Sequence, residues 1–315
     1  MFLGIDGGGT KTSFVLIDGE GRLLARHLAP TSYYLEIGFD ALRDLLLDGI
    51  QATLGQAEVS PWDIGFAFAG LPAHGEDSGL LPAFDALLSD QFPRSRVGND
   101  MVCSWAGSLA GADGISLVAG TGSIAYGEFA GRGARSGGWG EVFGDEGSAY
   151  WLAREALALF SRMADGRAEP GPLLGLVRTH FELHHDLDLC AAINGQAARS
   201  RLAQLARLLT SAAEGGDTQA GELLKRAGDE LAALAFGVAR NLALPAGQAI
   251  PVSYSGGVFE AGELVLGPLR AALAHRLPQA TLTTPRFGPE LGAAIYAARL
   301  ASAGLSDLAL SRLAP

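Results

Sequence analysis

The stretch Gly4-Ile5-Asp6-Gly7-Gly8-Gly9-Thr10-Lys11-Thr12 decides the fold, because three successive glycines join one short apolar strand to the next. It is not a Walker A loop, since Thr10 stands where that motif needs a lysine after its last glycine. It is not a dinucleotide fingerprint either, because the strand Ser13–Ile17 follows it where that fingerprint needs a helix. We therefore predict a hairpin whose backbone N–H groups can converge on phosphate oxygens, with a plain Asp-Gly hairpin as the alternative.

The residues of this hairpin suggest two roles at a phosphate site. Asp6 would repel a phosphate directly, so we expect it to act on a magnesium ion, through water. Backbone N–H groups, hydroxyls and an ammonium group suit the phosphate itself, and they come from Gly8, Gly9, Thr10, Lys11 and Thr12.

The segments around the hairpin predict a mixed sheet covered by helices, which is an α/β fold. Apolar runs predict strands at 2–6, 13–17, 23–28 and 64–69, and a short strand that ends at residue 97. Helical periodicity predicts helices at 39–54, 77–92 and 99–109. A second strand, glycine turn and strand, at 115–129, repeats the opening and suggests a duplicated domain. We expect domains at 1–113 and 114–288, with the last segment, 289–315, packing back on the first.

The second domain is expected to contain a helical insertion. Residues 146–241 are almost all of helical pattern, and the expected elements after them are a strand at 250–254, a helix at 263–276, a strand at 280–283 and a helix at 289–303.

The composition narrows the classes of function. The chain has 315 residues and a formal charge of −11, which argues against nucleic acid or an anionic membrane as the main partner. Two separate cysteines, Cys103 and Cys190, form no metal-binding pair, and we expect both to be buried thiols. Because Met1 leads straight into a strand without a signal peptide, we expect a cytoplasmic protein.

Glycines also gather at two later positions. Eleven of the 44 glycines lie between Gly114 and Gly147. The turn Gly120-Thr121-Gly122 is a candidate second phosphate hairpin, and Gly256-Gly257 at a strand end would let an adenine base lie flat against the backbone.

These three glycine segments resemble the two phosphate motifs and the adenosine motif of the acetate/sugar kinase–actin–heat-shock chaperone superfamily. The segment Gly137-Gly138-Trp139-Gly140, followed by Gly144-Asp145-Glu146-Gly147-Ser148-Ala149-Tyr150-Trp151, resembles the N-acetylglucosamine kinases and their glucosamine-kinase-like relatives more specifically. The resemblance implies an ATP- and Mg²⁺-dependent amino-sugar kinase, with two ribonuclease-H-like domains around an interdomain cleft. It also implies a homodimer as the assembly and N-acetylglucosamine 6-phosphate as the product, with glucosamine as the alternative substrate.

The same resemblance implies the roles of individual residues. Asp100 matches the catalytic base, although an aspartate before a helix is also a common N-cap. Asp145 matches a residue that accepts hydrogen bonds from sugar hydroxyls, and Trp139 offers an apolar face to the ring or is a packing residue. The family's sugar-binding Asn after the third strand is missing here, so Ser32 or Tyr33 must replace it. The expected sugar-binding residues are Ser32, Tyr33, Asn99, Asp100, Gly138, Trp139, Gly140 and Asp145.

Three other interpretations of the chain are weaker. His180, His184 and His185 do not form an HExxH motif, so we expect a solvated helix face. An ATPase activator of the dehydratase type shares this fold, but it carries cluster-binding cysteines near the second phosphate motif, where this chain has none. A sugar-sensing repressor would need a DNA-binding extension, which we do not expect before the strand at residue 2.

Overall fold

The computed structural model describes residues 1–194 and 199–314, and its contacts divide the chain into two units. Unit 1 contains residues 1–113 together with the segment from Thr284 to the end of the described chain, and unit 2 is Gly114–Thr283. The last segment of the chain therefore belongs to the same unit as the first strand. The return to unit 1 occurs at residue 284, five residues before the boundary predicted at 289.

Unit 1 has a five-stranded sheet of order β3-β2-β1-β4-β5. Its elements are β1 (Phe2–Gly7), β2 (Thr12–Ile17), β3 (Leu23–Ala29), α1 (Tyr34–Ile37), α2 (Phe39–Ala57), η1 (Pro61–Asp63), β4 (Phe66–Leu71), η2 (Ser78–Leu80), α3 (Leu81–Ser89), β5 (Ser95–Asn99), α4 (Met101–Leu109), α12 (Pro289–Leu300) and α13 (Asp307–Leu313). β1, β2 and β3 pair antiparallel, whereas β4 and β5 continue from β1 in parallel.

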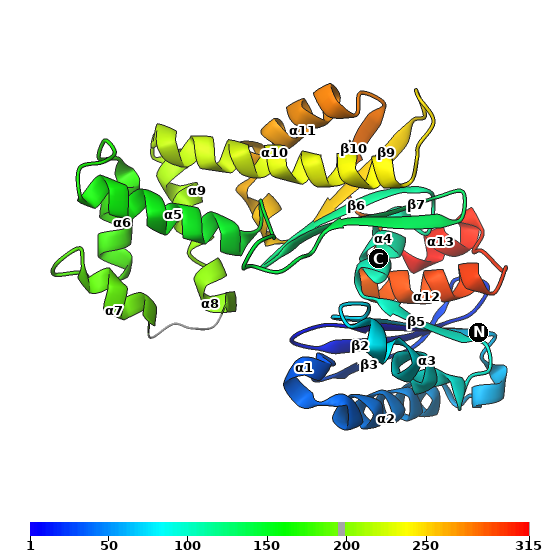
Figure 1. The fold of residues 1–315 in the computed structure, drawn as a ribbon. Helices are drawn as coiled ribbons and strands as arrows, with labels where there is room; N and C mark the ends of the chain where they lie inside the picture. The colour runs from blue at the N-terminus through cyan, green and yellow to red at the C-terminus, as the bar shows by residue number, and fades with distance from the viewer. Residues whose placement is uncertain (195–198, 315) are drawn as a thin grey trace. The chain divides into compact units, whose positions relative to one another are not determined.

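Helices cover both faces of this sheet, with α2 and α3 on one side and α4 and α12 on the other (Figure 1). The approach of α12 to β1 depends on Gly4, because a Cβ atom at that position would overlap the backbone nitrogen of Ala294. The opposite face is filled by large apolar side chains such as Phe14 and Leu46, which are fully buried. The two ends of the chain thus pack against the same sheet.

Unit 2 repeats the arrangement with a sheet of order β10-β9-β6-β7-β8. Its elements are β6 (Gly114–Ala119), β7 (Ser123–Phe129), β8 (Arg132–Gly137), α5 (Ala149–Ala164), α6 (Pro172–His180), α7 (Asp188–Asn194), α8 (Arg199–Ala203), α9 (Ala206–Glu214), α10 (Thr218–Asn241), β9 (Ile250–Ser255), η3 (Gly257–Ala261), α11 (Glu263–Arg276) and β10 (Ala280–Thr283). An antiparallel three-stranded meander followed by two parallel strands occurs in both units, so the duplication predicted from the sequence is confirmed.

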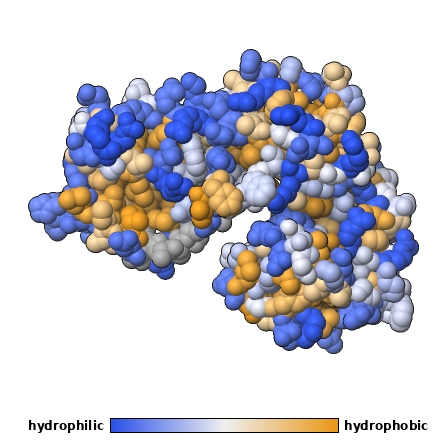
Figure 2. Space-filling view, viewed as in Figure 1, coloured by the Kyte–Doolittle hydropathy of each residue, from blue (hydrophilic) through white to orange (hydrophobic). Residues whose placement is uncertain are grey.

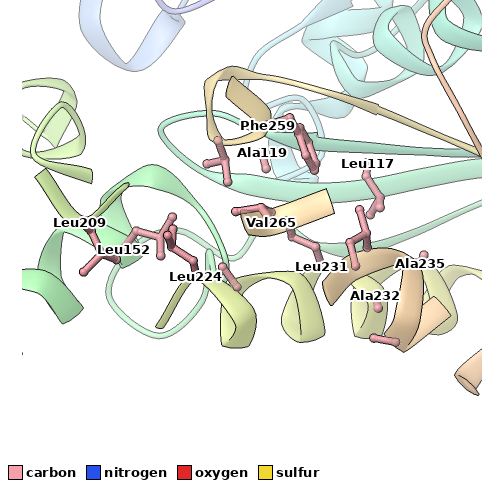
Figure 3. Packing of buried hydrophobic residues seen from close by; sticks show 14 of the residues in the cluster. Leu117, Ala119, Leu152, Leu209, Leu224, Leu231, Ala232, Ala235, Phe259 and Val265 are labelled. Atoms are coloured by element: carbon pink, nitrogen blue, oxygen red, sulfur yellow. The ribbon is translucent and has the colours of Figure 1, made fainter. Parts of the chain in front are cut away.

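The core of unit 2 joins the sheet to the helical insertion. Leu231 and Ala235 of α10 pack under Leu117 of β6, and further along the same core Leu152 of α5 lies beside Leu209 of α9 (Figure 3). Side chains of small volume on α10 let it lie close to both the sheet and α11. The surface is largely hydrophilic, with apolar side chains gathered over α6 and α7 (Figure 2), where Leu187 is 82% exposed.

Several elements differ from the sequence-based expectations. Strand β8 and helix α13 were not predicted, and the helix expected at 77–92 starts at Leu81 after a 3-10 turn. Cys103 is buried as expected, but Cys190 is exposed, so that prediction was wrong. Cys190 lies on the outer side of the short helix α7, next to the buried Leu189. Among the described residues, no helix is long and apolar enough to cross a membrane.

Candidate functional site

The carboxyl ends of β1, β4 and β5 bring two aspartates together in unit 1. The register places Asp6 beside Gly70 and Gly70 beside Gly98, two residues before Asp100. The absence of a side chain at Gly70 matters here, because a Cβ atom there would overlap the Sγ atom of Cys103 and approach the Cα atom of Asp100. Asp6 and Asp100 are consequently close enough for the charge of Asp100 to raise the pKa of Asp6.

The side chain of Asp100 is not used to cap helix α4. Asp100 occupies the N-cap position, yet its side chain makes no capping hydrogen bond. The neighbouring Asn99 does this instead, because its Oδ1 atom accepts from the backbone N–H of Met101 at 3.1 Å. Asn99 also donates through Nδ2 to the carbonyl oxygen of His74 at 3.0 Å. The Asp100 carboxylate is therefore not the capping group of α4, although the backbone amides of residues 100 and 101 lie near it.

Burial sets the protonation of both carboxyl groups. Burial raises the pKa of Asp100 to about 6, the charge of Glu76 adds to this, and the nearby amides of residues 100 and 101 oppose it. Burial, and then the charges of Asp100 and Glu290, raises the pKa of Asp6 to about 8. Asp100 is therefore a carboxylate at neutral pH that retains appreciable basicity, while Asp6 holds its proton until a cation approaches.

Asp6 is expected to lower the stability of the protein as the pH rises. In the unfolded chain its carboxyl group ionises near pH 3.9, about four units below its folded pKa of about 8. Between these values the unfolded chain binds fewer protons, so stability falls with pH and the loss is complete above pH 8. The Asp6→Asn variant should therefore melt roughly 5 °C or more above the wild type at pH 8. At pH 4 its melting temperature should equal that of the wild type.

The measurement is thermal unfolding at both pH values, with the exposed Asp48→Asn as the matched control. A gain of the same size at pH 4 and pH 8 would show that ionisation of Asp6 is not its cause.

The residues of the first glycine hairpin that were predicted to bind phosphate differ in their exposure. Gly9, Thr10 and Lys11 are exposed at the turn. Thr12 differs from the expectation: it is fully buried and its Oγ1 atom donates to the carbonyl oxygen of Pro30 at 2.8 Å. Its hydroxyl proton is thus already used, and Thr12 shapes the hairpin. Gly8 accepts at its carbonyl oxygen from the Thr31 hydroxyl at 3.1 Å, which ties the turn to the loop after β3.

That loop carries the two residues expected to replace the missing asparagine. Ser32 is fully buried, and its Oγ atom has no hydrogen-bond partner among the described residues. This atom faces Gly7, where any Cβ atom would overlap it. Tyr33 is partly exposed and its backbone N–H donates to Thr31 Oγ1 at 3.1 Å. Ser32 therefore lies directly against β1, next to Asp6.

In unit 2 the second glycine hairpin meets the glycine pair after β9. The turn is closed by the backbone N–H of Gly120, which donates to the carbonyl oxygen of Gly122 at 2.9 Å. Gly256 has a φ of 106° and lies so close to the turn that a Cβ atom would overlap the carbonyl group of Ala119. Only glycine fits there, and the two segments of unit 2 that were predicted to bind the nucleotide, the turn 120–122 and the glycine pair 256–257, meet at one place.

A cavity of about 610 Å³ opens at this meeting point. Its volume lies in the range of small-molecule sites. The lining residues are Gly120, Thr121, Ala149, Leu152, Ala203, Gln204, Ala206, Arg207, Thr210, Ser211, Gly257, Val258, Glu260 and Ala261. Sequence reasoning found the glycine side of this cavity but not the wall formed by residues 203–211, which carry no motif beyond a helical pattern.

The loop between β8 and α5 is tied to the same hairpin. Helix α5 begins at Ala149 behind the N-cap Ser148, whereas the sequence predicted a helix opening at Asp145 and Glu146. Asp145 instead has a left-handed backbone with a φ of 60°, is 3% exposed, and accepts from the backbone N–H of Ser123 at 3.2 Å. Its carboxylate thus connects the loop to the turn beside the cavity.

Trp139 in this loop is an exposed side chain. It is 63% exposed, and the Arg135 guanidinium lies over its ring at 5.2 Å from the centroid. The flanking Gly138 and Gly140 have φ values of 68° and 82°, which hold the loop in a conformation that side chains disfavour. A packing role in the interior is therefore excluded for Trp139, whose ring contacts the Arg135 side chain at the surface.

The three histidines do not share one helix. Helix α6 ends at His180, and His184 and His185 follow it in an exposed loop. Within the described part of the chain, no group of three or more His, Cys, Asp or Glu residues is placed to hold a metal ion by itself. A magnesium ion at Asp6 would need oxygen ligands from elsewhere, as it commonly takes from water and phosphate.

Comparison with known proteins finds a matching family model and several relatives that are named as amino-sugar kinases. The model of the BadF/BadG/BcrA/BcrD ATPase family matches residues 3–297. N-acetyl-D-glucosamine kinase of Dictyostelium discoideum is 28% identical over 311 residues, covering 94% of this chain and 97% of that protein. N-acetylmuramic acid/N-acetylglucosamine kinase of Clostridium acetobutylicum is 29% identical over 303 residues, with the same coverage.

A solved structure agrees with these relatives. A candidate N-acetylglucosamine kinase from Chromobacterium violaceum is 29% identical and superimposes with a TM-score of 0.70, covering 95% of this chain and 98% of its own. The resemblance predicted from the glycine motifs is therefore confirmed, and the α/β architecture is the two-domain sugar-kinase fold. Since the family model spans nearly the whole sequence, the chain belongs to the BadF/BadG/BcrA/BcrD ATPase family.

Proposed function

We propose that this protein transfers the γ-phosphoryl group of ATP to a hydroxyl group of an amino sugar, with N-acetylglucosamine and its 6-hydroxyl as the preferred substrate and position. The observation that carries the proposal is the Asp100 carboxylate, which is partly buried, is not used as a cap and has a pKa raised to about 6. The cavity beside the second glycine hairpin supports a nucleotide as the other substrate.

Asp100 is proposed as the general base. As the sugar oxygen forms its bond to the γ-phosphorus, its proton passes to the Asp100 carboxylate, and the bond from that phosphorus to the bridging oxygen breaks to release ADP. A positioned base of this kind contributes about 10²- to 10⁴-fold to the rate. The hydrogen bonds of Asn99 fix the start of α4 and so hold Asp100 at the end of β5.

The glycine turns are proposed to position the nucleotide. The backbone of Gly8 and Gly9, with the exposed Thr10 and Lys11, suits one group of phosphate oxygens, and the turn 120–122 suits another. Asp6 fits a magnesium ion held through water, because its carboxyl group lies among negative charges that a cation would relieve. Such an ion supplies neutralisation of the charge that develops on the phosphate oxygens.

The residues proposed to contact the sugar are those that the family resemblance implies: Asn99, Ser32 or Tyr33, Gly138, Trp139, Gly140 and Asp145. Ser32 supports this role best, because its buried hydroxyl has no partner among the described residues and lies beside β1. Glucosamine is the second candidate substrate, since the loop with Ser32 lacks the amide that the related kinases carry.

A dehydratase-activating ATPase is the alternative of a different class. Cys103 is buried beside Asp6, with its Sγ atom 3.7 Å from the carbonyl oxygen of Ile5, and Cys190 lies on α7 in the other unit. Neither thiol is in the second glycine turn. The cysteines of the chain therefore do not support an iron–sulfur cluster there.

The test is a coupled assay of ADP release over glucosamine, N-acetylglucosamine, N-acetylmannosamine and glucose. We expect release to depend on added sugar and to be fastest with an amino sugar. ADP release at one rate with and without every sugar would overturn the kinase assignment in favour of a simple ATPase, and iron content measured on the same sample would identify a cluster protein.

The rate should also depend on pH in a direction set by Asp100. The base acts only when ionised, and its pKa of about 6 means that it becomes protonated on the acid side of neutrality. We expect kcat/KM for the sugar to fall about tenfold per pH unit below pH 6 and to be level just above pH 7. A profile that stays level down to pH 5 would contradict the assignment of Asp100 as base.

A further inference from the structure

An ion pair joins the two walls of the cavity in unit 2. Arg207 of α9 and Glu260 of η3 both line the cavity, and the Arg207 Nη2 atom lies 3.7 Å from Glu260 Oε2. Their side chains are 82% and 72% exposed. An exposed pair of this kind contributes little to folding, so the fold does not require it.

The position of Arg207 is fixed by the packing of α9. Leu209 and Ala212 on the same helix are fully buried, and Leu209 lies beside Leu152 in the core (Figure 3). Because this anchor holds α9 against α5, Arg207 stays at the cavity wall while its long side chain remains free to turn toward the interior.

The cavity has no aromatic side chain for a nucleotide base to stack on. None of the described residues that line it is Phe, Tyr, Trp or His. One face of a flat base can lie against Gly257, because a Cβ atom there would meet nothing nearer than Glu260 Oε1 at 3.9 Å. The other face needs a planar partner, and a guanidinium group stacks on aromatic rings.

We propose that Arg207 stacks its guanidinium group on the base of the bound nucleotide, opposite the Gly257 backbone, and that Glu260 orients Arg207 for this contact. The proposal rests on the proposed use of ATP and names the residue of this chain that stacks on the base. Among the described residues that line the cavity, Arg207 is the one with a planar cationic group. Glu260 lies three residues after Gly257 and forms the ion pair with Arg207, so it can orient the guanidinium group toward the base.

The test is calorimetric titration of ADP, without sugar, into the wild type, Arg207→Lys, Arg207→Met and Glu260→Gln. Lysine keeps the charge but loses the planar group, whereas methionine loses both. If stacking is the role, both Arg207 variants weaken ADP binding by about tenfold, and Glu260→Gln weakens it by a smaller factor. The matched control is Arg270→Lys, whose exposed pair with Glu263 at 3.1 Å lies outside the cavity.

The outcomes separate this inference from the proposed function. ADP binding that Arg207→Lys retains and Arg207→Met loses would overturn stacking in favour of a simple charge on the phosphates. Unchanged binding in both variants would overturn any role of Arg207, while the kinase proposal would stand. A wild type that binds neither ADP nor ATP would overturn the nucleotide-dependent function itself. Melting temperatures of the variants within about 2 °C of the wild type would confirm that the fold is intact.

Discussion

Replacing Asp100 with asparagine is expected to lower kcat for sugar phosphorylation by at least about 10², while ADP affinity stays within about twofold. Asparagine keeps the size of the side chain and cannot accept the proton of the sugar hydroxyl. The start of α4 should be unaffected, because the Asn99 side chain accepts the hydrogen bond of the Met101 N–H and caps the helix. Steady-state kinetics in the coupled assay, together with calorimetric ADP titration, measure both quantities.

The exposed Asp90→Asn, at the end of α3, is the matched control for this variant. It makes the same change of charge in the same unit, away from the ends of β1 and β5, and kcat should be that of the wild type. Near-normal turnover in Asp100→Asn would remove this residue as base. A loss of turnover together with a lower melting temperature would instead assign Asp100 a structural role.

Alanine at position 257 is expected to weaken ADP binding about tenfold or more without lowering the melting temperature. The added methyl group would meet no protein atom nearer than 3.9 Å, so the fold accommodates it. It would stand in the cavity on the surface where we place the base, and overpacking at a filled site costs a factor of this order. ADP titration and thermal unfolding check the two halves of the prediction.

Two other glycine substitutions serve as controls for this variant. Gly175→Ala on α6 also adds a methyl group in open space, but outside the cavity, and should leave ADP binding unchanged. Gly256→Ala should lower the melting temperature, because its Cβ atom would overlap the Ala119 carbonyl and its φ of 106° disfavours a side chain. Wild-type ADP affinity in Gly257→Ala would place the base elsewhere.

The sequence predicted the parts of the fold that depend on local patterns. The two hairpins at 2–17 and 115–129 are signalled by apolar strands around glycine turns, and the structure has both. Helix α11 and strand β10 have the residue bounds that their periodicity predicts. Strand β8 was missed because Arg-Gly-Ala-Arg-Ser-Gly has no apolar alternation, and its pairing with β7 comes from the neighbouring strand.

The site could be predicted only where a motif accompanies the geometry. The glycine pair at 256–257 was recognisable, but the opposite wall of the cavity comes from α9, whose position depends on core contacts distant in sequence. The sequence predicted that Thr12 binds phosphate, but its hydroxyl group donates a hydrogen bond to the carbonyl oxygen of Pro30 instead. The left-handed turn at Asp145 likewise depends on its bond to Ser123, 22 residues earlier, which no local pattern indicates.

The assembly of unit 1 from both ends of the chain has a consequence for synthesis on the ribosome. Unit 2 is one continuous segment, Gly114–Thr283, so all of its strands and helices emerge before α12 is made. Until then β1 lacks the helix that packs against Gly4, and the part of the first sheet that α12 covers is exposed to water. Unit 2, although it begins later in the chain, should therefore complete its folding before unit 1. The N-terminal segment can complete unit 1 only after the segment from residue 284 onward, with α12 and α13, has been made.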